Sequence, residues 1–227
     1  MDLTYYILFV VPALILSFAA QIGVKRAYAQ TSKLACRRGL TGAQAAEAVL
    51  RYYGITNVRI EACAGNLTDH FDPKSGVIRL SEGVFNVCSV AAVGIACHEA
   101  GHAAQYAESY LPIRVRNAML PITRIGSYAG FPLALIGFWL SFEPLITIGL
   151  FLYSFIMLFQ LATLPVELNA SRRALRVIEE TGMMTGDDEL KGARKVLKSA
   201  AMTYVASLAV SFANLLRLVL LFTRRRS

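Results

Sequence analysis

Two histidines and a glutamate near the middle of the chain have the spacing of a metal site. Residues 98–102 read His-Glu-Ala-Gly-His, an HExxH pattern. Histidines four positions apart lie on one face of a helix, where both imidazoles can bind one zinc ion. Glu99 would lie beside that metal and take a proton from a water that the metal activates. The neighbouring residues are small and apolar, so surface histidines with a salt-bridging glutamate are a poorer explanation. We therefore predict His98 and His102 as zinc ligands and Glu99 as a general base.

A catalytic zinc normally has three protein ligands and one open position, so a third ligand is needed. No histidine follows within the ten residues after His102, and the only other histidine is His70. The acidic candidates downstream are Glu108, Glu143, Glu167 and the cluster from Glu179 to Glu189. The cluster is expected to be solvated, whereas Glu167 borders an apolar segment and shares a helix face with small residues (Ala170, Ser171 and Ala174). Glu167 is therefore favoured; the alternative is that it stabilises a helix N-terminus.

The composition is typical of a membrane protein. Hydrophobic residues make up 56% of the 227 residues, the mean hydropathy is +0.49, and the net charge is +8. Apolar runs cover residues 5–24, 127–142, 145–164 and 200–223, and the middle two are predicted to form a hairpin around Glu143-Pro144. Basic residues gather at the ends of these runs, which fits contact with anionic lipid, and no nucleic-acid-binding module is present. We therefore expect a lipid bilayer as a partner, and no nucleic acid.

The positive-inside rule predicts on which side the loops lie. Basic residues follow the first run (Lys25, Arg26, Lys33, Arg37 and Arg38) and the third run (Arg172, Arg173 and Arg176). Both regions are therefore expected in the cytoplasm, with Glu143-Pro144 outside. A full fourth crossing would carry Arg224–Arg226 outward, against the rule. The last run either enters differently or lies along the surface as an amphipathic helix, or the whole orientation differs.

A small lobe is predicted between the first and second runs. Thr41 and Gln44 have capping-box spacing, which predicts a helix from Thr41 that ends at Tyr53-Gly54. Residues 58–62 and 77–80 read as strands, and the long, turn-rich loop between them predicts a hairpin-like ribbon.

Two further features follow from sequence pattern. Pro165 is predicted in the first turn of a helix that Thr163 or Leu164 caps and that runs to Glu180. The cysteines form no CxxC pair and are expected to be reduced, buried thiols, with Cys97 pointing away from the metal; they are Cys36, Cys63, Cys88 and Cys97.

Together these elements predict a mainly α fold. It would contain integral membrane helices plus a cytoplasm-facing zincin-like lobe with a short two- or three-stranded β ribbon next to the HExxH helix. Residues 1–227 would form one domain. Its parts would be an anchor (5–24), the lobe (25–116), a transmembrane hairpin (127–164), a segment with the third ligand and a polar helix (165–199), and a hydrophobic C-terminal helix (200–223).

Three segments in this order resemble a known family. They are HEAGHAAQ, the upstream LTDHFDP followed by VIRLSEGVFN, and the downstream VELNASRRAL. They resemble the bacterial YugP-like membrane zinc metallopeptidases over nearly the whole chain, and more distantly the HtpX and CAAX-type gluzincin proteases. The resemblance implies a multi-pass protein of the bacterial inner (plasma) membrane, with Glu167 as the third ligand. It departs at Ser171, where those proteases usually have an aspartate that orients a zinc-binding histidine. The orienting group is then expected from elsewhere, for example from Asn169.

The expected function is zinc-dependent hydrolysis of peptide bonds in membrane or membrane-proximal proteins, with Zn²⁺ as cofactor and Glu99 as base. His70 is a candidate catalytic oxyanion donor, as are Tyr106 and Tyr128; the alternative for His70 is a loop histidine bound to neighbouring aspartates. The strand at 77–80, or its partner, could bind an extended substrate by strand addition.

The alternative function is a membrane adaptor or scaffold with a structural or vestigial zinc site. Structural zinc usually has four protein ligands, and Glu99 would have no purpose there. A homo-oligomer or a regulatory membrane partner is left open. Arg172 and Arg173 are expected to have a structural or lipid-headgroup role rather than to bind substrate.

Overall fold

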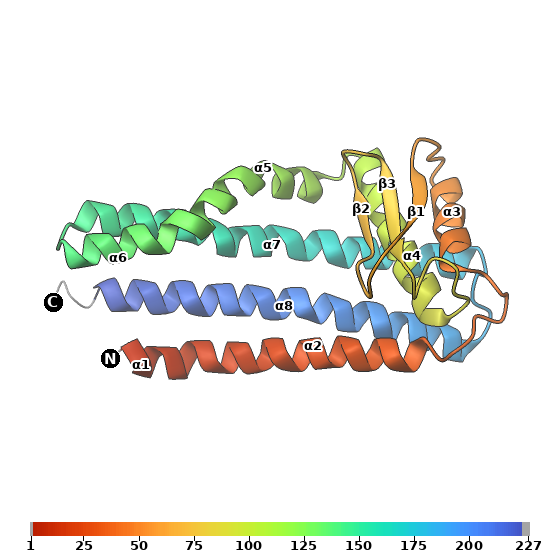
Figure 1. The fold of residues 1–227 in the computed structure, drawn as a ribbon, viewed down its shortest axis with the longest axis horizontal. Helices are drawn as coiled ribbons and strands as arrows, with labels where there is room; N and C mark the ends of the chain where they lie inside the picture. The colour runs from red at the N-terminus through yellow and green to blue at the C-terminus, as the bar shows by residue number, and fades with distance from the viewer. Residues whose placement is uncertain (1, 224–227) are drawn as a thin grey trace. The chain divides into compact units, whose positions relative to one another are not determined.

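The fold is built mainly from helices, with one small sheet (Figure 1). The computed structural model describes residues 2–223. Its elements are α1 (Asp2–Tyr5), the π-helical turn η1 (Tyr6–Val10), α2 (Val11–Thr31), α3 (Gly42–Tyr52), β1 (Arg59–Cys63), β2 (His70–Asp72), β3 (Val77–Ser81), α4 (Val90–Ala107), α5 (Leu111–Ile125), the π-helical turn η2 (Gly126–Gly130), α6 (Phe131–Trp139), α7 (Glu143–Glu180) and α8 (Asp187–Thr223). The mainly α fold with a three-stranded sheet is confirmed.

Contacts divide the chain into two compact units. The mixed unit consists of Ile22–Tyr110 and Val166–Ala201, and it contains the sheet. The helical unit consists of the chain up to Gln21, Leu111–Pro165 and the chain from Met202 onward. Each unit has its own hydrophobic clusters.

The sheet of the mixed unit has the strand order β1-β3-β2. β2 pairs with β3 antiparallel, with Phe71 opposite Ile78, whereas β1 pairs with β3 parallel, with Ile60 opposite the same residue. The predicted hairpin of residues 58–62 and 77–80 is therefore wrong. A tight turn after β2 explains the difference, because the Asp72 carboxylate accepts from the backbone N–H of Lys74. β2 thereby occupies the antiparallel side of β3, and β1 takes the other side.

Helix α4 lies against the sheet and α3 in the mixed unit (Figure 1). The hydroxyl of Ser89 accepts from the N–H of Ala92 and caps its N-terminus. The predicted capping box of Thr41 and Gln44 is present at the start of α3. Most of α4 consists of buried alanine, valine and glycine, so neighbouring backbones can approach it closely. A Cβ on Gly101 would lie only 2.8 Å from the carbonyl oxygen of Ala170 in α7.

The helical unit contains the predicted hairpin. α6 ends at Trp139 and α7 begins at Glu143, and the two helices run side by side (Figure 1). Glycines form the contact: a Cβ on Gly149 would lie 2.4 Å from the backbone nitrogen of Ala134, and one on Gly126 would lie 2.2 Å from the carbonyl oxygen of Leu152. Small residues that let backbones meet are the usual contact between membrane helices.

Within residues 2–223, four helical segments are long and apolar enough to cross a membrane: Leu3–Thr31, Leu111–Trp139, Glu143–Glu180 and Asp187–Phe222. Large apolar side chains remain on their surfaces, and Trp139 is 84% exposed. An exposed apolar surface of this extent suits lipid as its surroundings. Arg224–Arg226, on which the topology conflict of the last run depends, lie outside the described residues.

Two predicted helix boundaries differ from the structure. α7 does not begin near Pro165 but continues through it, and the hydroxyl of Thr163 donates to the carbonyl oxygen of Phe159 one turn back instead of capping a new helix. The apolar residues on both sides favour one uninterrupted helix, and proline is tolerated inside membrane helices. Likewise, α8 joins the expected polar and hydrophobic C-terminal segments without a break.

Glu189 is a buried carboxylate, contrary to the expectation that its acidic cluster is solvated. Its side chain is 0% exposed. Its Oε2 accepts from the backbone N–H groups of Thr185 and Gly186 just before α8, and its Oε1 accepts from the N–H of Arg37. Backbone donors are thus the reason that the carboxylate is buried at a helix N-terminus.

We expect Glu189→Ala to lower the free energy of unfolding by about 1–3 kcal/mol, because three backbone N–H groups lose their acceptor. The matched control is Asp188→Ala, which removes only an exposed ion pair with Arg37 and should cost less than about 1 kcal/mol. Thermal unfolding in detergent measures both. An equal loss of stability in the two variants would contradict the role of Glu189 as the acceptor of these three N–H groups.

We also expect Gly101→Ala to lower the melting temperature, although alanine is the better helix former. The new methyl group would press on the Ala170 carbonyl, a backbone atom that cannot rotate away, and overpacking of this kind costs about 1–3 kcal/mol. Gly23→Ala in α2 is the control, because nothing lies within 4 Å of its Cβ position. The packing argument would be wrong if both variants matched the wild type.

Candidate metal centre

Three side chains of the mixed unit converge on one point. The Nε2 atom of His98 lies 3.3 Å from Oε2 of Glu167, and the Nε2 atom of His102 lies 3.5 Å from the same oxygen. The ligand atoms all lie within 4.8 Å of one another, and this is the group of metal-ligating side chains found among residues 2–223. The two imidazole rings stand nearly perpendicular, with centroids 4.7 Å apart. The structure thus brings together the three residues predicted as zinc ligands.

The residues present fit a zinc ion. Oε2 of Glu167 is buried and accepts no hydrogen bond within the described part of the chain, and the residue is only 4% exposed. Leaving a buried carboxylate oxygen without a hydrogen bond is costly, whereas a cation between this oxygen and the two imidazole nitrogens would satisfy it. Two imidazole nitrogens and one carboxylate oxygen are also a donor set of catalytic zinc sites, with a coordination position left for water.

Local packing explains how the ligands meet. Both histidines lie one turn apart on α4, as their spacing predicted. The close approach of Gly101 to Ala170 brings α7 against this face of α4, so Glu167, about one turn before Ala170 on α7, reaches the histidines. The small residues that suggested such an approach are in place: Ala170 and Ala174 are buried, and Ser171 is 9% exposed.

Each histidine has a contact on its other ring nitrogen. The hydroxyl of Ser171 lies 3.1 Å from Nδ1 of His98, so the expectation that the orienting group comes from elsewhere is wrong. A shorter side chain suffices because the backbones are so close here. Asn169 does not reach His98; its Oδ1 accepts from Gln105 and Arg173.

Gln105 lies against His102 and was missed from the sequence. It is 0% exposed, and its Oε1 lies 3.0 Å from Nδ1 of His102. The available signal was its position three residues after His102, on the same helix face of an apolar segment.

Glu99 is held by the sheet. It is half-buried, and its Oε2 accepts from the backbone N–H of Phe71 in β2 at 3.0 Å. The sheet thus fixes one oxygen of this carboxylate. The Phe71 ring packs edge-on against Tyr106 of α4, with centroids 5.6 Å apart.

The structure does not bring His70 into the ligand cluster. It is exposed, and its Nδ1 lies 2.8 Å from the carbonyl oxygen of Thr68. Side chains alternate along a strand, so His70 points away from the face on which Phe71 meets α4. A catalytic role for His70 stays a prediction.

Of the two strands predicted as a possible substrate edge, the strand at 77–80 is wrong, whereas its partner does lie at an edge. Residues 77–80 belong to β3, which has a neighbour on both sides, so its backbone offers no free edge. The partner strands β1 and β2 are the edges of the sheet.

The carboxylates of the site favour a proton on His102. Burial alone would lower the pKa of His102, but the neighbouring Glu167 and Glu99 outweigh it and raise the pKa above its ordinary value. A metal cation would replace this proton as the partner of the carboxylates.

The cysteines take no part in the cluster, as predicted for Cys97. Its thiol is buried and faces the carbonyl oxygen of Ala45 and the sulfur of Met183, and burial raises its pKa. All four cysteines are free, as expected, but only Cys36 and Cys97 are buried. Cys63 is partly exposed, and Cys88 is exposed because it lies in the loop before α4.

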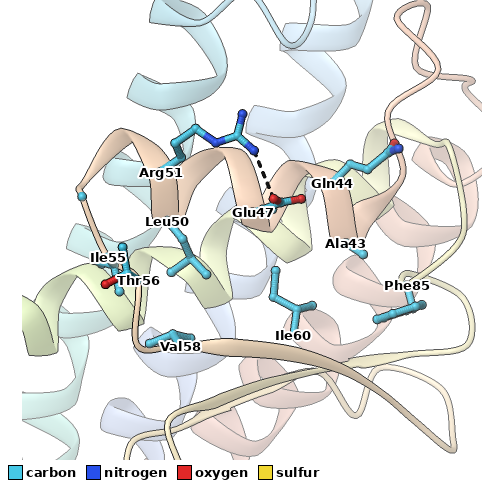
Figure 2. Close-up of a pocket in the computed structure, with 11 residues that line it drawn as sticks. Ala43, Gln44, Glu47, Leu50, Arg51, Ile55, Thr56, Val58, Ile60 and Phe85 are labelled. Carbon is cyan, nitrogen blue, oxygen red and sulfur yellow. Dashed lines mark hydrogen bonds and ion pairs between the residues drawn. The ribbon is translucent and has the colours of Figure 1, made fainter.

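A pocket of about 670 Å³ lies elsewhere, between α3 and β1 (Figure 2). Its apolar lining includes Leu50, Ile55, Val58, Ile60 and Phe85. Its charged side chains, Glu47 and Arg51, form an ion pair of 3.0 Å along α3, as Figure 2 shows. It contains none of the predicted ligands, so the candidate chemistry lies at the histidine cluster and not in this pocket.

Comparisons with known proteins agree with this geometry. Residues 6–223 match the family described as "Putative neutral zinc metallopeptidase". The Bacillus subtilis (strain 168) protein named "Putative membrane protease YugP" is 42% identical over 221 residues, which cover 97% of this chain and 98% of that protein. No solved structure matches the chain. With the match extending over nearly its whole length, the chain belongs to the family described in these words.

Proposed function

We propose that this protein is an integral-membrane zinc endopeptidase that cleaves membrane or membrane-proximal proteins. The observation that carries the proposal is the buried Oε2 of Glu167, which makes no hydrogen bond among the described residues and faces the Nε2 atoms of His98 and His102. The location of Glu99 beside this group supports hydrolysis, because a carboxylate there can act as a base. The active site is proposed to face the cytoplasm, on the basic-residue pattern of the flanking loops.

His98, His102 and Glu167 would hold the zinc ion. Bound there, zinc would acidify a water molecule and polarise the scissile carbonyl group. Glu99 would take a proton from the attacking water at the carboxylate oxygen that Phe71 does not hold and give it to the leaving amine. The N–H of Phe71 holds Oε2, so Glu99 is already oriented before substrate arrives. The β2 edge next to this hydrogen bond is a proposed track for an extended substrate.

A scaffold with structural zinc is the competing function. Three protein ligands leave one coordination position open, whereas structural sites are usually closed by four. An oriented glutamate beside an open position favours the enzyme.

The first test compares wild type with Glu99→Gln in detergent, measuring zinc content and casein cleavage. We expect one zinc per chain in both forms and at least about a 10²-fold loss of cleavage in the variant, because the base is lost while the ligands remain. Glu82→Gln, an exposed change outside the cluster, should cleave like wild type. Absence of stoichiometric zinc from both wild type and Glu99→Gln would refute the metal centre.

The raised pKa of His102 predicts a pH dependence of the metal-free protein. Since the folded pKa lies above the ordinary 6.5, protonation stabilises the fold fully below 6.5, and this contribution is lost as the pH rises through the folded value. The melting temperature of chelator-treated protein should fall over this interval, and zinc should restore it. His102→Gln should remove this dependence. A pH-independent melting temperature of the metal-free wild type would contradict the prediction.

A further inference from the structure

We infer that Gln105 is a positioning residue that holds His102 in the tautomer with its proton on Nδ1, so that Nε2 presents a lone pair to the metal. Asn169 and Arg173 keep the Gln105 amide in the required orientation. The inference rests on the proposed zinc centre and names residues outside its ligands and base.

Gln105 reaches three groups at once. Its Oε1 lies 3.0 Å from Nδ1 of His102, and its Nε2 donates to the carbonyl oxygen of Val166 at 2.8 Å and to Oδ1 of Asn169 at 2.9 Å. The side chain is fully buried, so water does not compete for these bonds. It therefore connects a ligand on α4 to the backbone next to Glu167 on α7.

The partners decide which end of the amide faces His102. A backbone carbonyl can only accept, so the group facing Val166 must be the amide nitrogen of Gln105. Nε of Arg173 can only donate, and it donates to Oδ1 of Asn169 at 2.8 Å, so this oxygen is also an acceptor for Gln105. Both neighbours thus require the same orientation, which leaves Oε1 toward His102.

The amide orientation then decides the tautomer. An amide oxygen can only accept, so Nδ1 of His102 must carry the proton of this hydrogen bond. In the neutral imidazole the other nitrogen, Nε2, then has the lone pair, and it is the atom that faces Glu167. Ser171 cannot do the same for His98, because a hydroxyl both donates and accepts. Gln105 therefore selects one tautomer of His102, whereas the contact of Ser171 with His98 selects none.

Arg173 anchors the outer end of this network. Its Nη2 donates to Glu108 at the end of α4 at 2.6 Å, and its guanidinium lies over the rings of Tyr53 and Tyr110. The contacts run from His102 through α7 and return to α4, so the network is closed and rigid. The expected structural role of Arg173 fits these contacts, whereas Arg172 is exposed.

The test measures zinc affinity and histidine tautomers in Gln105→Met, which keeps the side-chain length but loses the acceptor and both donors. Zinc dissociation constants come from competition with a chelator. The tautomers come from ¹⁵N spectra of the metal-free protein at a pH above the His102 transition, where the imidazole is neutral. The presence of only three histidines makes these spectra simple to assign. We expect zinc binding about 10–100-fold weaker and loss of the His102 signal with its proton on Nδ1. Asn169→Leu, which removes one of the two acceptors that fix the amide and leaves the Val166 carbonyl, should show the same two changes to a smaller extent.

Gln44→Met is the matched control, because it makes the same substitution in the α3 capping box, away from the cluster. It should lower the melting temperature without changing zinc affinity or the His102 spectrum. If wild type binds zinc and both Gln105→Met and Asn169→Leu retain its affinity and its His102 tautomer, the role of Gln105 is overturned while the metal centre stands. If wild type binds no zinc, both fall.

Discussion

The metal centre depends on one contact between two backbones, that of α4 with α7 at Gly101 and Ala170. There is no room for a Cβ at this point, and the closeness lets short side chains span the gap. The short side chain of Ser171 reaches His98 because the two helices are so close, and Glu167 contacts two histidines of the neighbouring helix. The alanine-rich surface of α4 follows from the same constraint, because any larger side chain would separate the helices.

Local chemistry explains what the sequence could reveal about the fold and the site. The HExxH spacing places two ligands on one helix face without any knowledge of tertiary structure, and the capping box of Thr41 with Gln44 is equally local. The small residues on the same helix face as Glu167 indicated that a second helix packs closely there, because small side chains let two backbones approach. The spans could be located from apolar runs since lipid requires long, uncharged helices.

The remaining features depend on partners far apart in the chain. The parallel pairing of β1 with β3 could not be inferred from the alternation of apolar and polar residues. That alternation is the same in parallel and antiparallel strands. Pro165 looked like a helix start because local preference favours that position, but its surroundings keep α7 continuous. Glu189 is buried with one oxygen on local backbone donors and the other on Arg37, which is distant in sequence. Gln105 is comparable. A glutamine is usually exposed to solvent, and the acceptors that allow this one to be buried come from α7.

The two residues that prepare the site for chemistry differ in their vulnerability to change. Glu99 is oriented by a main-chain N–H of β2, and that donor remains whichever amino acid occupies position 71, with proline as the exception. His102 is oriented by side chains, and each member of that network can be lost in a single substitution. Evolutionary drift at position 71 would thus leave the orientation of Glu99 intact, while drift at positions 105, 169 or 173 would alter the surroundings of a ligand. The orientation of Glu99 thus tolerates side-chain substitution at position 71, whereas the orientation of His102 depends on the identity of three side chains.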